Sequence, residues 1–216
     1  MPRPRFDNLD ETRRRELLVG AAVELAEHGY EGASLNRIIR GAGLSKGAFY
    51  YYFDDKADLL ETVARFAIDE LTADAALDLD FGSCDRDSFW PTVEGWFHDL
   101  MARFREVPWA AGLGQLIYHP PPVDGVHDLV ARHFAAARAW LDALLRHGRG
   151  VGAVRDDLPV ELLLRMVMAA MEAGDAWFVD HWSELEPDRR DELAGLTFDV
   201  ARRMCRPGAE LVEVPS

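Results

Sequence analysis

Apolar positions recur along this chain at intervals of three and four residues, the spacing of helices that bury one face. Between residues 10 and 28 the apolar set includes Leu17, Ala21 and Leu25, and Gly29 follows it. Glycine readily adopts the left-handed conformation that closes many helices, so we expect the first helix to end there. Few segments show the period of two that is typical of strands.

Two short helices are expected next, each after a serine that can accept hydrogen bonds from the free amides of the first turn. The first begins after Ser34 and ends before the turn at residues 41–43. The second begins after Ser45 and carries Phe49 and Phe53 on one face. Two short helices joined by a glycine-containing turn are typical of a helix-turn-helix, whose second helix fits the major groove of DNA.

Six further helices are expected, separated by glycines and prolines that weaken or interrupt a helix. They span residues 55–77, 88–106, 108–118, 124–148, 159–183 and 188–206. The sequence therefore predicts an all-α fold of about nine helices.

Charge is distributed unevenly along the chain. The formal net charge of −14 at pH 7 by itself disfavours binding to duplex DNA. Residues 1–56, however, hold nine basic and nine acidic residues, whereas the remainder holds 15 basic and 29 acidic ones. Residues 33–53 contain no acidic residue, and both lysines, Lys46 and Lys56, lie in or beside this stretch. This asymmetry indicates a locally DNA-compatible face on an otherwise acidic chain.

Other function classes find little support in the sequence. No apolar run approaches the ~18 residues that a membrane span requires, and the first residues lack the apolar stretch of a secretion signal. Cys84 and Cys205 suggest neither a disulfide framework nor a zinc site. The HExxH, GxSxG and phosphate-loop patterns of common enzymes are absent. We expect a cytoplasmic protein that is not an enzyme, needs no cofactor or metal, and has no membrane partner.

The second short helix carries residues suited to a DNA groove. Small residues let a helix backbone approach base edges, lysine can contact guanine or phosphate, and tyrosine hydroxyls can donate to phosphates. Ser34 and Lys56, at the starts of neighbouring helices, are placed to hold phosphates. Each side chain could instead serve only the fold, as a helix cap, a solvated charge or a packing group. The outward-facing set is Lys46, Gly47, Ala48, Tyr50 and Tyr51.

Between residues 21 and 60 the order and spacing of several short motifs carry a resemblance. They are Gly29-Tyr30, Ser34-Leu35, Ala42-Gly43-Leu44-Ser45-Lys46-Gly47, Phe49-Tyr50, Tyr52-Phe53 and Lys56 with Leu59-Leu60. This stretch closely resembles the DNA-binding domain of TetR-family transcriptional regulators. Two positions depart from the usual pattern, Ile39 and Gly41, but neither removes an outward-facing contact.

The resemblance implies a ligand-responsive regulator, most simply a repressor that binds a near-palindromic operator as a homodimer and is released by a small apolar or aromatic effector. An activator of the same fold, or a small-molecule-binding protein that does not bind DNA, remains an alternative. The resemblance also implies a DNA-binding domain over residues 1–56 and a ligand-binding and dimerisation domain over residues 57–216. From the residue types and the resemblance together, the candidate DNA-binding residues are Ser34, Asn36, Arg37, Ser45, Lys46, Gly47, Ala48, Tyr50, Tyr51 and Lys56.

The C-terminal part is rich in aromatic residues and methionine, and all six tryptophans lie beyond residue 89. Such side chains can line an adaptable cavity for an apolar ligand, although each could equally fill the core. His98, Glu172 and Asp175 are polar candidates for orienting a ligand, and the two carboxylates could instead face solvent. The candidate ligand-binding residues are Trp96, Phe97, Met101, Trp109, Leu113, Ile117, Trp140, Met166, Ala170 and Trp177.

The last two expected helices are candidates for a dimer surface, as the resemblance implies. Small residues on the first of them, Ala169, Ala170, Ala173 and Gly174, permit close helix approach. The second carries an apolar stripe at helical spacing, made of Leu193, Leu196, Val200 and Met204. This stripe could instead pack within one chain.

Overall fold

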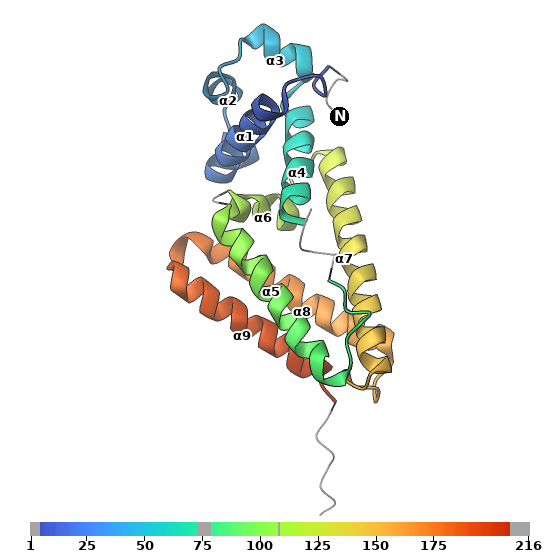
Figure 1. Cartoon of the computed structure of the whole chain (residues 1–216). Helices are drawn as coiled ribbons and strands as arrows, with labels where there is room; N and C mark the ends of the chain where they lie inside the picture. Colours follow the sequence, from blue (N-terminus) through green and yellow to red (C-terminus); the bar gives the residue numbers. More distant parts are fainter. Residues whose placement is uncertain (1–4, 73–78, 108, 208–216) are drawn as a thin grey trace, which may run out of the picture. The chain divides into compact units, whose positions relative to one another are not determined.

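The computed structural model describes residues 5–72, 79–107 and 109–207, and within these ranges it contains helices and no strand (Figure 1). The predicted all-α fold is confirmed, with nine α-helices in the described part of the chain. Contacts divide the chain into two compact units, residues 1–76 with 102–134 and residues 77–101 with 135–216. The functional boundary expected after residue 56 concerns roles rather than contacts, and it stays a prediction.

The first unit contains the helix-turn-helix and the helices packed against it. The long helix α1 packs against α2, α4 and α6. The elements are α1 (Glu11–Gly32), α2 (Leu35–Gly41), α3 (Lys46–Tyr52), α4 (Lys56–Thr72), α6 (Ala110–Tyr118) and the first part of α7 (Asp124–Gly150). The expected helix over residues 55–77 is described only to Thr72, because residues 73–78 lie outside the described part.

The end of α1 differs from the expectation. Gly29 leaves the helical conformation, with φ of 65° and ψ of 175°, as its position in the sequence predicted. The chain nevertheless resumes a helical turn that runs to Gly32. The backbone N–H of Ala33 donates to the carbonyl oxygen of Gly29, and this bond closes the extra turn. The predicted break at Gly29 is therefore confirmed, but α1 carries one further turn to Gly32.

Aromatic rings form the centre of the first unit's core. Phe49 and Phe53 are fully buried, and their ring centroids lie 5.2 Å apart. Leu17 and Ala21 of α1 and Leu60 of α4 are buried in the same cluster. The packing of these aromatic and aliphatic side chains holds α3 against its neighbours and determines which of its faces points outward.

The second unit has a separate core. It consists of α5 (Arg86–Glu106) up to residue 101, the remainder of α7, α8 (Val160–His181), the short 3₁₀ helix Trp182–Glu184, and α9 (Pro187–Cys205). The last residues of α5 belong to the first unit, and α8 packs against α9. Phe89, Leu145 and Leu163 are its largest fully buried side chains. No helix among the described residues is both long and apolar enough to cross a membrane.

Candidate nucleic-acid interface

Helix α3, the second helix of the helix-turn-helix and the candidate recognition helix, has one buried face and one open face. Ser45 caps its start, because the Ser45 hydroxyl oxygen accepts a hydrogen bond of 3.1 Å from the backbone N–H of Ala48. Phe49 has no exposed surface, whereas Tyr50 and Tyr51 are 50% and 48% exposed. The packing of the phenylalanines therefore orients the tyrosines away from the core.

The residues predicted to bind DNA lie on the surface of the helix-turn-helix. In the turn between its helices Gly43 adopts φ of 62°, a left-handed conformation that favours glycine. Three members are half-buried: Ser34 at the start of α2, Ala48 within α3 and Lys56 at the start of α4. The exposed members are Asn36, Arg37, Ser45, Lys46, Gly47, Tyr50 and Tyr51. Their surface positions fit the predicted role, which remains a prediction.

A buried carboxylate, Glu24 of α1, holds the start of α2. It accepts a 2.7 Å hydrogen bond from the backbone N–H of Ser34 and bonds of 2.8 and 2.9 Å from Nε of Arg37. The Ser34 hydroxyl oxygen in turn accepts a 3.4 Å bond from the backbone N–H of Arg37. Sequence reasoning missed Glu24, although an acid within the apolar stretch of a helix was a visible signal.

The hydrogen bonds from Arg37 lower the pKa of Glu24 to about 2 from its usual value of 4.5, with the Ser34 amide acting in the same direction. Glu24 is therefore ionised at neutral pH and neutralises the guanidinium of Arg37. Nη2 of the same guanidinium also donates a 3.2 Å hydrogen bond to the carbonyl oxygen of Gly32. Arg37 thus has a structural role at the junction of α1 and α2, in addition to its predicted contact with DNA.

Lys56 is held at the start of α4 by the end of α1. Its Nζ donates to the carbonyl oxygen of Glu31 at 3.4 Å and lies 4.8 Å from the ring centroid of Tyr30. An ammonium group has three donors, so this contact leaves capacity for a phosphate. Asp58 completes the helix start by accepting a 3.0 Å bond from the backbone N–H of Asp54.

The predicted ligand-binding residues do not form one set in the structure. Trp109 is buried in the first unit, with its ring centroid 5.7 Å from that of Phe66, and Ile117 is half-buried in the same unit. Leu113 lies in α6, but its side chain is outside the described part. The other seven, Trp96, Phe97, Met101, Trp140, Met166, Ala170 and Trp177, belong to the second unit.

In the second unit, two aromatic pairs bring several of these candidates together. The ring centroids of Trp96 and Trp140 are 4.7 Å apart, and the ring of Phe97 stacks on that of Phe198 at 4.5 Å. Met166 and Trp177, in contrast, are each 43% exposed. The polar candidates, His98, Glu172 and Asp175, are all exposed.

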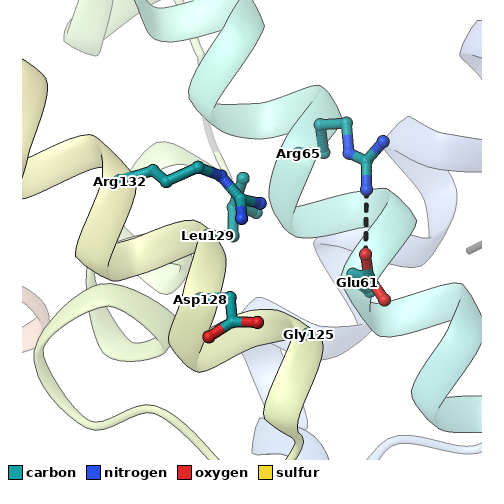
Figure 2. Close-up of a pocket in the computed structure, with 6 residues that line it drawn as sticks. All are labelled: Glu61, Arg65, Gly125, Asp128, Leu129 and Arg132. Carbon is teal, nitrogen blue, oxygen red and sulfur yellow. Dashed lines mark hydrogen bonds and ion pairs between the residues drawn. The ribbon is translucent and has the colours of Figure 1, made fainter.

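An open cavity of about 540 Å³ lies between α4 and α7 in the first unit (Figure 2). Arg65 and Glu61 of α4 are paired across 2.8 Å at this cavity. A Cβ atom at Gly125 would overlap the carboxylate of Glu61, so the lack of a side chain there permits the contact. The lining residues are Glu61, Arg65, Gly125, Asp128, Leu129 and Arg132, none of which was a predicted ligand-binding residue.

The two cysteines of the chain are buried thiols. Cys84 and Cys205 are both free and buried, and burial raises the pKa of the Cys205 thiol to about 12. Cys205 is therefore a neutral thiol at physiological pH and a poor nucleophile. No group of three His, Cys, Asp or Glu side chains among the described residues could hold a metal ion.

Comparison with known proteins agrees with the geometry of the helix-turn-helix. Residues 17–63 match the family model described as bacterial regulatory proteins, tetR family. An HTH-type transcriptional repressor of Mycobacterium tuberculosis is 28% identical over 185 residues, which cover 81% of this chain and 90% of the relative. The repressor AcnR of Corynebacterium diphtheriae is 47% identical over 53 residues, which cover 24% of this chain and 28% of the relative.

Among solved structures, a TetR family transcription regulator from Marinobacter aquaeolei resembles this chain over nearly its full length. The TM-score is 0.63 with 25% sequence identity, and the match covers 93% of this chain and 98% of that one. The AcnR similarity is confined to about a quarter of each chain, whereas the structural similarity extends through the C-terminal helices. The relatives are regulators of transcription rather than enzymes.

Proposed function

We propose that this chain, which belongs to the TetR family of bacterial regulatory proteins, is a cytoplasmic repressor that binds a near-palindromic operator as a homodimer and is released by a small apolar or aromatic effector. DNA binding and regulation follow from the family. The operator, the effector, the homodimer and the cytoplasmic location are the proposed parts.

The open face of α3 is the observation that carries the DNA-binding part of the proposal. Lys46 and Gly47 are exposed at the start of this helix, and Tyr50 and Tyr51 are exposed along it. Lysine at the start can reach base edges, while the phenolic hydroxyls can donate to phosphate oxygens. Asn36, Ser34 and Lys56 extend the proposed contacts to the adjacent helix starts.

The aromatic cluster of the second unit supports the effector part. The indole N–H of Trp140 is buried and has no hydrogen-bond acceptor among the described residues. Buried donors are usually paired, so an effector with an acceptor atom beside an apolar or aromatic body suits this position. Trp96, which lies against Trp140, would supply apolar contact to the same molecule.

The exposed apolar residues of α8 and α9 support the homodimer. Leu196 and Val200 of α9 are 53% and 55% exposed, and both belong to the stripe recognised in the sequence. An isologous pairing of α8 and α9 from two chains would cover these side chains on each copy. Two recognition helices related by a twofold axis then require a near-palindromic site.

Repression is released if the effector favours a dimer whose recognition helices no longer match successive grooves. The effector can shift this equilibrium only by its different affinity for the two states, and a coupling of about 1–3 kcal/mol is typical. Effector binding that leaves operator affinity unchanged would exclude this mechanism.

Selection from a random duplex pool tests the DNA-binding proposal directly. The wild-type chain is expected to enrich a near-palindromic sequence, whereas a Lys46→Ala, Tyr50→Ala double variant is expected to enrich none. Both chains are checked by circular dichroism, so that loss of folding is recognised. Absence of enrichment by the folded wild-type chain, even at low salt and across candidate effectors, would contradict sequence-specific binding.

A further inference from the structure

The segment that precedes α1 is anchored beside the recognition helix. Phe6 is only 3% exposed, and its ring centroid lies 4.9 Å from that of Phe53 and 5.9 Å from that of Tyr52. Phe53 is itself fully buried at the end of α3. Figure 1 shows this dark-blue segment passing close to α3 before α1 begins. Phe6 therefore belongs to the core of the helix-turn-helix and fixes the position of its neighbours.

Local hydrogen bonds give this segment a defined shape. The backbone N–H of Asn8 donates to the carbonyl oxygen of Arg5, and that of Leu9 donates to Phe6. Asp10 then caps α1, since its side chain accepts a bond from the backbone N–H of Arg13. The chain from residue 5 to the start of α1 is thus a succession of turns attached to the core at Phe6.

This arrangement places the guanidinium of Arg5 over the ring of Tyr51. Its Cζ atom lies 4.7 Å from the ring centroid, within the range of a cation–π contact. Both residues are exposed, and Tyr51 is one of the residues predicted to contact phosphate. A cation and a phenolic hydroxyl therefore lie together on the open side of α3.

The charge of Arg5 differs from that of Arg37 in one respect. Arg37 is neutralised by the buried carboxylate of Glu24, whereas Arg5 has no carboxylate partner among the described residues. An arginine that is fixed in place but not neutralised can meet an anion without first breaking an ion pair. Its planar fork of donors matches the geometry of two phosphate oxygens.

We infer that Arg5 and Tyr51 together form a clamp for a DNA phosphate, which extends the interface beyond the helix-turn-helix motif. The Arg5 guanidinium donates two hydrogen bonds to the phosphate oxygens, and the Tyr51 hydroxyl donates to the same strand. Stacking on Tyr51 holds the guanidinium plane in place before DNA arrives. This inference rests on the proposed DNA-binding function and adds a contact that reads the backbone, not the bases.

Fluorescence anisotropy with two duplexes tests the clamp. One duplex carries the sequence enriched by the wild-type chain, and the other is a scrambled duplex of equal length. Arg5→Ala is expected to weaken binding to both by a similar factor of about five to ten, because a phosphate contact is independent of sequence. It should also reduce the slope of log K against log salt by about 0.9 for each lost contact.

Three further variants separate the clamp from general effects. Arg138→Ala removes one positive charge from an exposed position on α7 in the second unit, and it should leave the salt slope unchanged. Arg5→Lys keeps the charge but loses the fork, so it should keep most of the slope and lose part of the affinity. Tyr51→Phe keeps the ring under Arg5 and should retain the Arg5-dependent part of the slope.

The outcomes distinguish this inference from the proposed function. If the wild-type chain binds DNA while Arg5→Ala keeps its affinity and salt slope, the clamp is wrong and the proposed function stands. A loss confined to the enriched duplex would also overturn the clamp, because it would indicate a base contact. If the wild-type chain binds neither duplex, the proposed function itself fails. Thermal unfolding of each variant confirms that the compared chains are folded.

Discussion

Helix α3 and the pair α8–α9 expose similar fractions of large side chains, but the chemistry of those side chains differs. On α3 the exposed aromatic residues, Tyr50 and Tyr51, carry hydroxyl groups and stand near Lys46 in a stretch without acids. On α8 and α9 the exposed set is apolar, namely Leu162, Met166, Met171, Trp177, Leu196 and Val200.

This difference indicates two kinds of partner. A hydroxyl beside a cation can exchange its water for phosphate oxygens, so it suits a charged polymer. Aliphatic side chains gain only by leaving water, at roughly 25 cal/mol per Å² of apolar surface, so they suit another apolar surface. Equal exposure therefore says little about function until the chemistry of the exposed atoms is considered.

The largest expected effect comes from a substitution in the exposed apolar surface of α9. Leu196→Glu places a charge in the proposed interface between copies, where it would be buried without a partner. We expect the dimer to dissociate and the operator affinity to fall by about 100- to 10,000-fold, because the two half-sites are no longer bound together. Analytical ultracentrifugation measures the first effect and anisotropy the second.

Arg189→Gln is the matched control for this variant. It changes the net charge by the same amount on the same helix, at an exposed residue that pairs with the similarly exposed Glu192 across 2.7 Å. An exposed pair of this kind contributes little to stability, so the dimer should persist. A Leu196→Glu chain that remains dimeric would show that α9 lies outside the interface.

The second effect concerns Glu24, the buried carboxylate that holds the start of α2 within the helix-turn-helix unit. Glu24→Gln removes the charge that holds Arg37 and the Ser34 amide, and we expect the free energy of unfolding to fall by about 2–3 kcal/mol at pH 7. Glu27→Gln on the same helix is the control, since its side chain is 65% exposed. Chemical denaturation of the three chains measures the difference, and equal losses in both variants would contradict the structural role of Glu24.

The pH dependence of this effect has a definite sign. Folding lowers the pKa of Glu24 from 4.5 to about 2, so its stabilising contribution is complete above pH 4.5. As the pH falls from about 4.5 towards 2, the carboxylate is protonated in the unfolded chain first and the contribution is lost. The stability difference between wild type and Glu24→Gln should therefore shrink over this interval.

The two sides also differ in how far the sequence predicted them. The helix-turn-helix depends on short-range features, such as the serine caps at Ser34 and Ser45 and the paired rings of Phe49 and Phe53. Because these features lie close together along the chain, they could be identified from the sequence. Glu24 was missed because its partners, at residues 34 and 37, are brought to it only by the turn after Gly29. The anchoring of Phe6 against Phe53 was likewise invisible, since it joins residues 47 positions apart.

The candidate ligand residues were harder to predict because aromatic content does not distinguish a cavity from a core. Trp109 and Trp140 had the same appearance in the sequence, yet the structure assigns them to different units. The apolar stripe on α9 was recognised correctly as a helical face, but its periodicity could not tell whether one chain or a second copy covers it. Long-range packing, which decides both questions, leaves little trace in local sequence patterns.

The smallest expected effect concerns the two lysines of the proposed DNA-binding surface. Lys46 and Lys56 are the two lysines of the chain, so their alanine variants remove identical charges and serve as controls for each other. Lys56→Ala should weaken binding to all duplexes by about fivefold, because a phosphate contact carries no sequence information. Lys46→Ala should instead change the ranking of duplexes, since Lys46 is exposed at the start of the recognition helix. Anisotropy across a panel of single-base variants measures both, and a changed ranking with Lys56→Ala would contradict its assignment to phosphate.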